Sequence, residues 1–166
     1  MYPTCYLKLS DAEAAYIAGF FDGEGMVTIH RDRAKGARGP RVNPNYVMSV
    51  RIAQGSLPVL EWIKSKVGGS ITRRFRESHH TRQHWTLALK SHPAQNFLEV
   101  VLPYLIVKRE EAVHAIAFQL RQSSEKNRYE AGRVGPVPRT PDEIAYKEHY
   151  FRLLQQLKKQ PASYSF

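Results

Sequence analysis

Two carboxylates close to residue 23 are the side chains of this sequence best suited to holding a metal ion. Asp22 ends, and Glu24 follows, a segment at residues 10–22 whose apolar spacing predicts a helix that Gly23 and Gly25 bring to an end. The C-terminal end of a helix carries partial negative charge, so further negative charge there requires compensation. A divalent cation would supply it, because hard cations prefer carboxylate oxygen. The alternative is that Asp22 and Glu24 are solvated residues of a turn.

Small residues recur at every fourth position of the same helix. Ala15, Gly19 and Gly23 therefore share one helix face. Small side chains let two helix backbones approach closely, as they do in membrane helix dimers, but this segment is too short and too acidic at its end for a bilayer. We expect this face to be a dimer interface between two helices. The alternative is a helix packed tightly on its own sheet.

Residues 17–25, with the sequence IAGFFDGEG, resemble the LAGLIDADG motif of homing endonucleases. The match includes the apolar start, the small pair at positions 18 and 19, both acidic positions and the closing Gly25. The resemblance extends over about residues 10–120, because the order of predicted elements also corresponds. The motif occurs once, and the resemblance is therefore to the single-motif, homodimeric members of the family.

The resemblance assigns chemical roles to four residues. Glu24 stands at the family's metal-binding acidic position, and the backbone carbonyl of Gly23 is its expected companion ligand. Gln54 corresponds to a polar residue that positions the attacking water. Lys108 corresponds to a lysine near the scissile phosphate, where its charge can stabilise the transition state. The expected metal is Mg²⁺, which fits hard oxygen ligands and is abundant.

Two other positions qualify this assignment. Asp22 corresponds to a position that stabilises the helix junction, so we do not count it as catalytic. Four residues beyond Gln54, where a family member supplies an arginine to the water network, this sequence has Pro58. Another basic residue must take that role, or the water network must be smaller.

The elements that position these residues follow from apolar spacing and turn-forming residues. Helical spacing predicts helices at 10–22, at 56–67, from His92-Pro93 to an interruption at Pro103, at 108–122 and from Pro141 onward. Alternation with a period of two predicts strands at 26–33, 45–54, 70–76 and 83–90. This order predicts an α+β fold, with a four-stranded antiparallel sheet and helices packed on one face. The resemblance implies that this sheet is saddle-shaped. The resemblance places the motif helix at the dimer axis.

Some side chains are expected at particular places in these helices. In the helix at 108–122, Val113, Ile116 and Leu120 are expected to face the core. Ser56 is expected to cap the helix that follows it. Two capping boxes are also predicted, formed by Ser10 with Glu13 and by Thr140 with Glu143.

The length of 166 residues suits one domain. We expect residues 1–166 to form a single unit, with an exposed linker at 123–139 and a C-terminal helix at 141–160. Cys5 is the only cysteine, which excludes an internal disulfide framework and a Cys-rich zinc module. No apolar stretch approaches the ~18 residues that a membrane span needs, and no signal peptide is recognisable. We therefore expect no membrane partner and a cytoplasmic or organellar location.

Positive charge is concentrated in the middle of the chain. The net charge is +10, and residues 28–90 alone contain 13 Lys/Arg and 3 Asp/Glu. The whole excess therefore lies in this continuous middle section, which contains the two predicted strand pairs with their turns and the helix between them. A polyanionic partner, double-stranded DNA, explains this placement better than general solubility does. The alternative is a solvated basic surface.

Base recognition is expected from alternate strand positions, because a two-stranded ribbon fits the major groove of DNA. If the apolar positions 27, 29, 48, 50 and 52 face the core, the side chains between them face DNA. Arg51, Arg74 and Arg76 are the best candidates for guanine contacts. The full set of predicted strand contacts is Thr28, His30, Asp32, Asn45, Val47, Ser49, Arg51, Thr72, Arg74, Arg76, His84 and Thr86. The basic turn adds Lys35, Arg38 and Arg41 as expected phosphate contacts.

Together these observations predict a site-specific DNA endonuclease of the homing type. It is expected to make a metal-dependent double-strand cut, as a homodimer, in a pseudo-palindromic target. The alternatives are an RNA maturase or a non-catalytic DNA-binding module on the same fold. His79, His80 and His84 surround a predicted turn without an accompanying cysteine, which argues against a zinc site there.

Overall fold

The computed structural model describes residues 9–32, 35–36, 39–40, 44–74, 84–124 and 139–159. The elements in chain order are α1 (Asp11–Glu24), β1 (Gly25–Asp32), β2 (Lys35–Gly36), β3 (Gly39–Pro40), β4 (Asn45–Gln54), α2 (Leu57–Val67), β5 (Ser70–Arg74), β6 (His84–Lys90), α3 (His92–Val101), the 3-10 helix η1 (Leu102–Tyr104), α4 (Arg109–Ser124) and α5 (Pro141–Leu157). The short pair β2 and β3 lies within the stretch predicted as a basic turn.

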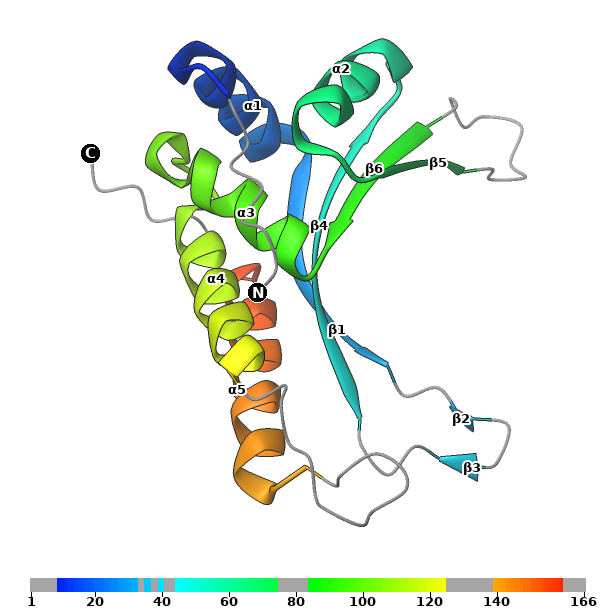
Figure 1. The fold of residues 1–166 in the computed structure, drawn as a ribbon, viewed down its shortest axis with the longest axis vertical. Coiled ribbons are helices and arrows are strands. Elements are labelled where there is room, and N and C mark those ends of the chain that lie inside the picture. Colours follow the sequence, from blue (N-terminus) through cyan, green and yellow to red (C-terminus); the bar gives the residue numbers. More distant parts are fainter. Residues whose placement is uncertain are drawn as a thin grey trace.

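The main sheet has four antiparallel strands in the order β1-β4-β6-β5, and β2 pairs with β3 separately. Helices α1, α3, α4 and α5 gather on one side of this sheet, and the opposite side is left open (Figure 1). The predicted α+β class, with a four-stranded antiparallel sheet covered by helices on one face, is confirmed.

The alternation of the strands places the apolar side chains on the helix-covered face. The register of β1 with β4 sets Val27 opposite Val50 and Ile29 opposite Met48. All four side chains are buried, as is Ile52, so the assignment of faces from the sequence holds. The helices complete this core with Ile17 and Phe21 from α1, Leu60 and Ile63 from α2, Phe97 from α3 and Phe118 from α4.

Helix α1 begins as predicted and ends later than predicted. Ser10 and Glu13 form the expected capping box, which satisfies two backbone donors of the first turn. The Gly25 N–H donates to the carbonyl of Phe21, which extends the helical hydrogen bonding past Gly23. The expectation that the helix stops at residue 22 is therefore wrong, and Glu24 belongs to its last turn.

Gly25 itself is required by close packing. A Cβ atom built on Gly25 would lie 2.0 Å from a carbon of the Phe21 ring, a distance that no real Cβ tolerates. The glycine that closes the motif therefore lets the chain turn from α1 into β1 directly against a buried aromatic ring.

The buried face of α4 differs from the predicted one. Val113 and Leu120 are 45% and 54% exposed, whereas Ala112, Ala115 and Phe118 are buried. Helix α4 packs against both α3 and α5, and alanines on the inner face let these helices approach closely. Ile116, the third predicted position, is partly buried against the core, so the inner face overlaps the predicted one only in part.

Three smaller expectations about helix ends are also corrected. Ser56 precedes α2 but makes no side-chain capping bond within the described chain. Helix α4 continues to Ser124, so the start of the predicted linker is helical, and residues 125–138 lie outside the described ranges. Helix α5 ends at Leu157, earlier than the predicted residue 160.

One carboxylate of helix α5 forms hydrogen bonds to two strands of the sheet. Thr140 and Glu143 form the predicted capping box at its start. Further along, Glu148 accepts hydrogen bonds from Arg31 of β1 at 2.8 Å and from the Tyr46 hydroxyl of β4 at 2.7 Å. This contact links α5 to the edge of the sheet. Among the described residues, no helix is both long and apolar enough to cross a membrane.

Candidate active site and nucleic-acid interface

The end of α1 and the end of β4 lie side by side. The register pairs Gly25, the first residue of β1, with Ile52, so Gln54 at the end of β4 lies next to the last turn of α1. Glu24 is exposed there, and Gln54 is half-buried with its side-chain carbonyl accepting a hydrogen bond from the Gly55 N–H at 2.6 Å. Two of the three predicted catalytic residues are thus brought together by strand pairing.

The third predicted catalytic residue reaches the same place through a clamp made by Asp22. The Asp22 carboxylate accepts backbone hydrogen bonds from Ile106 at 2.8 Å, Val107 at 3.1 Å and Lys108 at 2.9 Å. In return, the Lys108 ammonium donates to the backbone carbonyl of Asp22. Lys108, which is 86 positions further along the chain, is thereby fixed beside the last turn of α1.

This clamp also offsets the charge at the end of α1. The last turn of the helix contains no basic residue of its own. The Lys108 ammonium supplies a positive charge at a C-terminal carbonyl, where the helix dipole is negative. The compensation expected from a cation therefore comes in part from a lysine, and Glu24 remains without a partner among the described contacts.

The donors around Glu24 fit a hard divalent cation. Glu24 and Gly23 are both exposed, and they offer a carboxylate and a backbone carbonyl at the same helix end. Oxygen ligands of these two kinds suit Mg²⁺ or Ca²⁺. Within the described ranges no three His, Cys, Asp or Glu side chains come together as a metal-binding group.

A second group of charges lies behind Lys108 and was not anticipated from the sequence. Burial raises the pKa of Glu111, and the positive charges of Lys158 and Lys108 oppose that shift. Burial likewise lowers the pKa of Lys158, and Glu111 opposes it. Lys158 follows α5 and Glu111 lies in α4, so only the tertiary fold brings them together. The one local signal is the helical spacing of Lys108 and Glu111.

The open face of the sheet carries the predicted DNA-contacting positions. Register places Thr28, His30, Val47 and Arg51 on this face in β1 and β4. The register continues this face into β6 and β5. There Thr86 of β6 pairs with Thr72 of β5, and His84 pairs with Arg74. The structure does not describe the side chains of Asp32, Lys35 and Arg74. It also does not describe the residues Arg38, Arg41, Arg76, His79 and His80.

Two of the predicted contacts are not accessible on this face. Ser49 is fully buried, and its hydroxyl has no hydrogen-bond partner in the described structure. Thr86 is 8% exposed. Both lie on the inner strands β4 and β6, where longer neighbouring side chains cover a short one. Ser49 and Thr86 therefore support the face and do not reach a base directly.

The exposed face of α1 is uncharged between its acidic ends. Ala15, Gly19 and Gly23 are all exposed, and a Cβ atom built on either glycine meets nothing within 4 Å in the described chain. Glycine costs about 0.5–1 kcal/mol relative to alanine inside a helix, and the packing of the described residues gives no reason for that cost. A surface that approaches α1 from outside the chain would explain both glycines.

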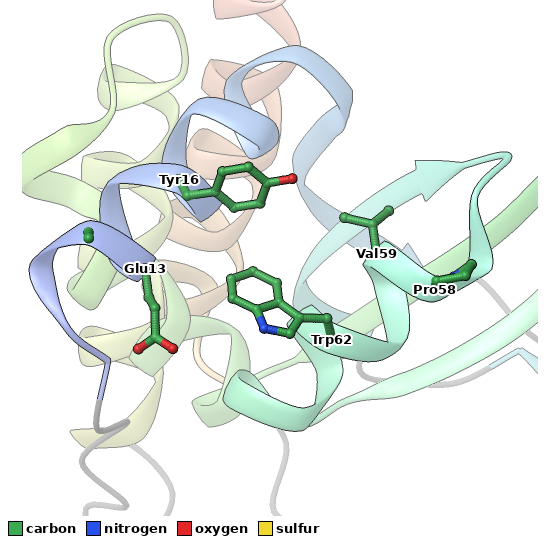
Figure 2. A pocket seen from close by; sticks show the side chains of 6 residues that line it. Glu13, Tyr16, Pro58, Val59 and Trp62 are labelled. Atoms are coloured by element: carbon green, nitrogen blue, oxygen red, sulfur yellow. The ribbon is translucent and has the colours of Figure 1, made fainter.

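An apolar groove adjoins this face. It lies between α1 and α2, and Figure 2 shows Tyr16 and Trp62 pointing into it from the two helices, with Val59 and Pro58 along the far side. The Tyr16 and Trp62 rings meet edge to face with centroids 5.5 Å apart, yet remain 53% and 37% exposed. Large aromatic side chains are thus left in water beside the glycine face.

Comparisons with known proteins agree with this fold. A family model described as LAGLIDADG endonuclease matches residues 17–109. The homing endonuclease I-CvuI in complex with its target superposes with a TM-score of 0.67 at 17% identity, covering 93% of this chain and 87% of that one. The homing endonuclease I-TnaI gives 0.60 at 14% identity, covering 90% and 96%. No curated protein sequence matches.

A third solved structure differs in length. The LAGLIDADG homing endonuclease I-GzeII, in complex with its DNA target, gives a TM-score of 0.60 at 18% identity. The match covers 83% of this chain and 43% of that one. This chain therefore corresponds to nearly all of I-CvuI and I-TnaI and to less than half of I-GzeII.

Proposed function

The chain belongs to the LAGLIDADG endonuclease family, and from this premise we propose that it is a site-specific DNA endonuclease. It binds a pseudo-palindromic double-stranded target as a homodimer and cuts both strands with a divalent cation, Mg²⁺ in the cell. The observation that carries this proposal is the clamp by which Asp22 brings Lys108 to the helix end that bears Glu24.

The residues at this helix end have separate tasks. Glu24 and the Gly23 carbonyl hold the cation, and Gln54 orients the attacking water. When bound, the cation polarises the phosphodiester and lowers the pKa of water. Lys108 places a fixed positive charge where negative charge develops on the phosphate in the transition state. The Asp22 carboxylate keeps Lys108 in place and does not touch substrate.

Dimerisation supplies the second half of the site. One chain carries one motif, and two strands must be cut. The uncharged face of α1, with Gly19 and Gly23, lets two copies of the helix approach closely and brings the two Glu24 side chains near each other. The apolar groove with Tyr16 and Trp62 extends the surface available for burial.

The open face of the sheet binds DNA. The charge excess lies within residues 28–90, which include most of these strands and the turns that join them, so electrostatic attraction contributes strongly to affinity and should weaken steeply as salt is raised. The accessible members of the face, among them Thr28, His30, Arg51 and Thr72, read base edges in the major groove. Lys35, Arg38 and Arg41 contact phosphates, which positions the protein without specifying sequence.

The rival proposal is an RNA maturase or a non-catalytic DNA-binding module. Pro58, in place of the arginine that a family member supplies to the water network, is the observation in its favour. Glu24, Gln54 and Lys108, all present at one helix end, argue for a working nuclease.

A randomised duplex library tests the proposal. The full chain is incubated with the library and Mg²⁺, and the cut ends are sequenced. We expect cut sites with twofold-related half-sites, and no cutting with a chelator or with Glu24→Gln. A folded protein that cuts no duplex with any divalent cation, yet binds DNA or a structured intron RNA, would establish the rival proposal.

A further inference from the structure

Two predicted DNA-reading residues touch each other across the open face of the sheet. The Arg51 Nη2 and His30 Nε2 atoms are 2.9 Å apart. Thr28 of β1 is paired with Ser49 of β4 in the register. His30 and Arg51 lie on opposite sides of this pair, His30 two residues further along β1 and Arg51 two residues further along β4. The contact is therefore a diagonal bridge. To make it, the Arg51 side chain must extend over the Thr28–Ser49 pair.

The burial of Ser49 agrees with this path. Ser49 is fully buried although it lies on the face that the helices do not cover. Its hydroxyl is also without a hydrogen-bond partner in the described structure. A long side chain stretched across Ser49 accounts for both facts. The bridge is thus part of the surface that DNA would meet.

The chemistry of the contact fixes the state of the imidazole. A guanidinium has only N–H donors and no acceptor. The His30 Nε2 atom must therefore accept, which requires a neutral ring with its proton on Nδ1. A protonated ring would present a donor to a donor, and the bridge would break.

The surroundings favour the neutral ring. Among the residues whose side chains the structure describes, the charged groups that act on His30 are Arg51 on β4, Lys90 on β6 and Lys158 after α5, all positive. Together with partial burial, which is the largest cause, they lower the pKa of His30 below its ordinary value of 6.5. The neighbouring Arg31 points to the other side, where it pairs with Glu148.

We propose that His30 and Arg51 form one reading unit, in which neutral His30 is a positioning residue that holds the Arg51 guanidinium ready for a guanine in each half-site. The unit rests on the proposed DNA-binding function and adds a specificity determinant to it. Arginine reads guanine by donating to the O6 and N7 acceptors together, which requires a guanidinium fixed in its plane. A held side chain also loses less freedom on binding than a mobile one.

Guanine discrimination by this unit should depend on pH, which it would not do if Arg51 only contacted a phosphate. As the pH falls through the pKa of His30, the ring gains a proton, releases Arg51 and adds a positive charge. Discrimination for guanine should then fall while affinity for unrelated DNA stays the same or rises. A loss of both together would indicate unfolding or a general electrostatic effect.

The first test uses the full chain without DNA. Long-range nitrogen–proton NMR of the imidazole should show neutral His30 at pH 7 with the proton on Nδ1. The midpoint of the His30 titration should lie below pH 6.5, and Arg51→Gln should raise that midpoint. A proton on Nε2 or a midpoint unaffected by Arg51→Gln would overturn the bridge, whatever the protein does to DNA.

The second test uses the duplex recovered from the randomised library, with each guanine replaced in turn by 7-deazaguanine or by another base. Affinities are measured with Ca²⁺ by gel shift from pH 8 down through the His30 titration midpoint that NMR gives. For one guanine per half-site we expect wild-type discrimination of about 10-fold or more at pH 8, lost as the pH falls below that midpoint. His30→Ala should lose it at every pH, and His30→Gln, which keeps an acceptor, should retain it at every pH.

His149→Gln on α5 is the matched control, because it removes an exposed histidine that lies outside the site. It should leave the pH dependence as in the wild type. If His30→Ala still discriminated that guanine as strongly as the wild type does, the proposed reading unit would be wrong. Failure of the proposed function would look different, since then no duplex would be recovered while the NMR result would stand.

Discussion

Asp22 and Lys108 bind each other twice. The Asp22 carboxylate accepts the backbone N–H of Lys108 at 2.9 Å, and the Lys108 ammonium donates to the backbone carbonyl of Asp22. A carboxylate that resembles a second metal ligand in the sequence therefore serves as the anchor of a remote loop. Its two further bonds, to the N–H groups of Ile106 and Val107, hold the whole turn before α4.

Asp22→Asn is expected to slow cleavage without abolishing DNA binding. The amide keeps one acceptor oxygen but cannot hold all three N–H groups, so Lys108 should move from its position. A displacement of that kind costs about 10- to 100-fold in rate at saturating DNA. Single-turnover cleavage and gel-shift affinity, measured in parallel, separate the two effects.

Glu61→Gln is the control for this variant, because it changes an exposed carboxylate on α2 that lies outside the clamp. Its cleavage rate should match the wild type. If Asp22→Asn lowered affinity as much as rate, Asp22 would act in docking and the positioning role would be wrong.

Gly19→Leu should separate the proposed dimer while leaving the monomer folded. The described chain offers open space at this position, so leucine costs nothing in intramolecular packing and raises helix propensity by roughly 0.5–1 kcal/mol. Two α1 helices, however, could no longer meet closely. Light scattering should give a monomer for the variant and a dimer for the wild type, with equal helical circular dichroism.

Two further substitutions serve as comparisons for Gly19→Leu. Lys64→Leu adds the same side chain on exposed α2 and should leave the dimer intact. Gly25→Ala should instead destabilise the fold itself, because its Cβ would collide with the Phe21 ring. A monomeric wild type, both alone and on DNA, would refute the dimer.

The Glu148 contact predicts a pH dependence of stability. The hydrogen bond from Tyr46, followed by those from Arg152 and Arg31, lowers the pKa of Glu148 below its ordinary value of 4.5. A carboxylate with a lowered folded-state pKa stabilises the fold above the unfolded value and loses that contribution as the pH falls through the folded one. Glu148→Gln should therefore cost about 1–2 kcal/mol at pH 7, allowing for partial exposure.

Urea unfolding at several pH values measures that difference. The gap between wild type and Glu148→Gln should narrow as the pH drops below about 4.5. Glu110→Gln, at an exposed position of α4, should show no such gap. A gap of constant size from pH 7 to pH 3 would mean that Glu148 acts through packing and not through its charge.

The sequence predicted best where a local pattern settles the outcome. Strand alternation assigned Val27 and Val50 to the core correctly, because the side-chain period of two leaves one choice of face. The capping boxes at Ser10 and Thr140 were equally local and are confirmed.

The sequence failed where the outcome depends on another element. Val113 is exposed and Ala112 is buried, because the packing of α4 against α3 and α5 sets its inner face, which helical spacing alone does not show. Ser49 is buried on the open face of the sheet, which alternation alone does not show because it depends on how longer neighbouring side chains such as Arg51 are placed. The charges around Glu111 and Lys158 meet only through the tertiary fold.

Lys108→Met tests the lysine separately from the metal ligands. It keeps the length of the side chain and removes the charge proposed to act on the transition state. Cleavage should slow at saturating DNA and Mg²⁺, while the Mg²⁺ concentration for half-maximal rate stays the same. A raised Mg²⁺ requirement would instead place Lys108 in the architecture of the metal site.

The central claim is that Glu24 holds the catalytic cation, and Glu24→Gln tests it most directly. The variant removes the charge but keeps the shape, and an amide is a poor ligand for a hard cation. Gel-shift affinity and plasmid linearisation with Mg²⁺ are measured in parallel on the recovered target. We predict that linearisation is lost while specific binding survives or tightens, since a negative charge near phosphates is gone. Linearisation at the wild-type rate would contradict the assignment.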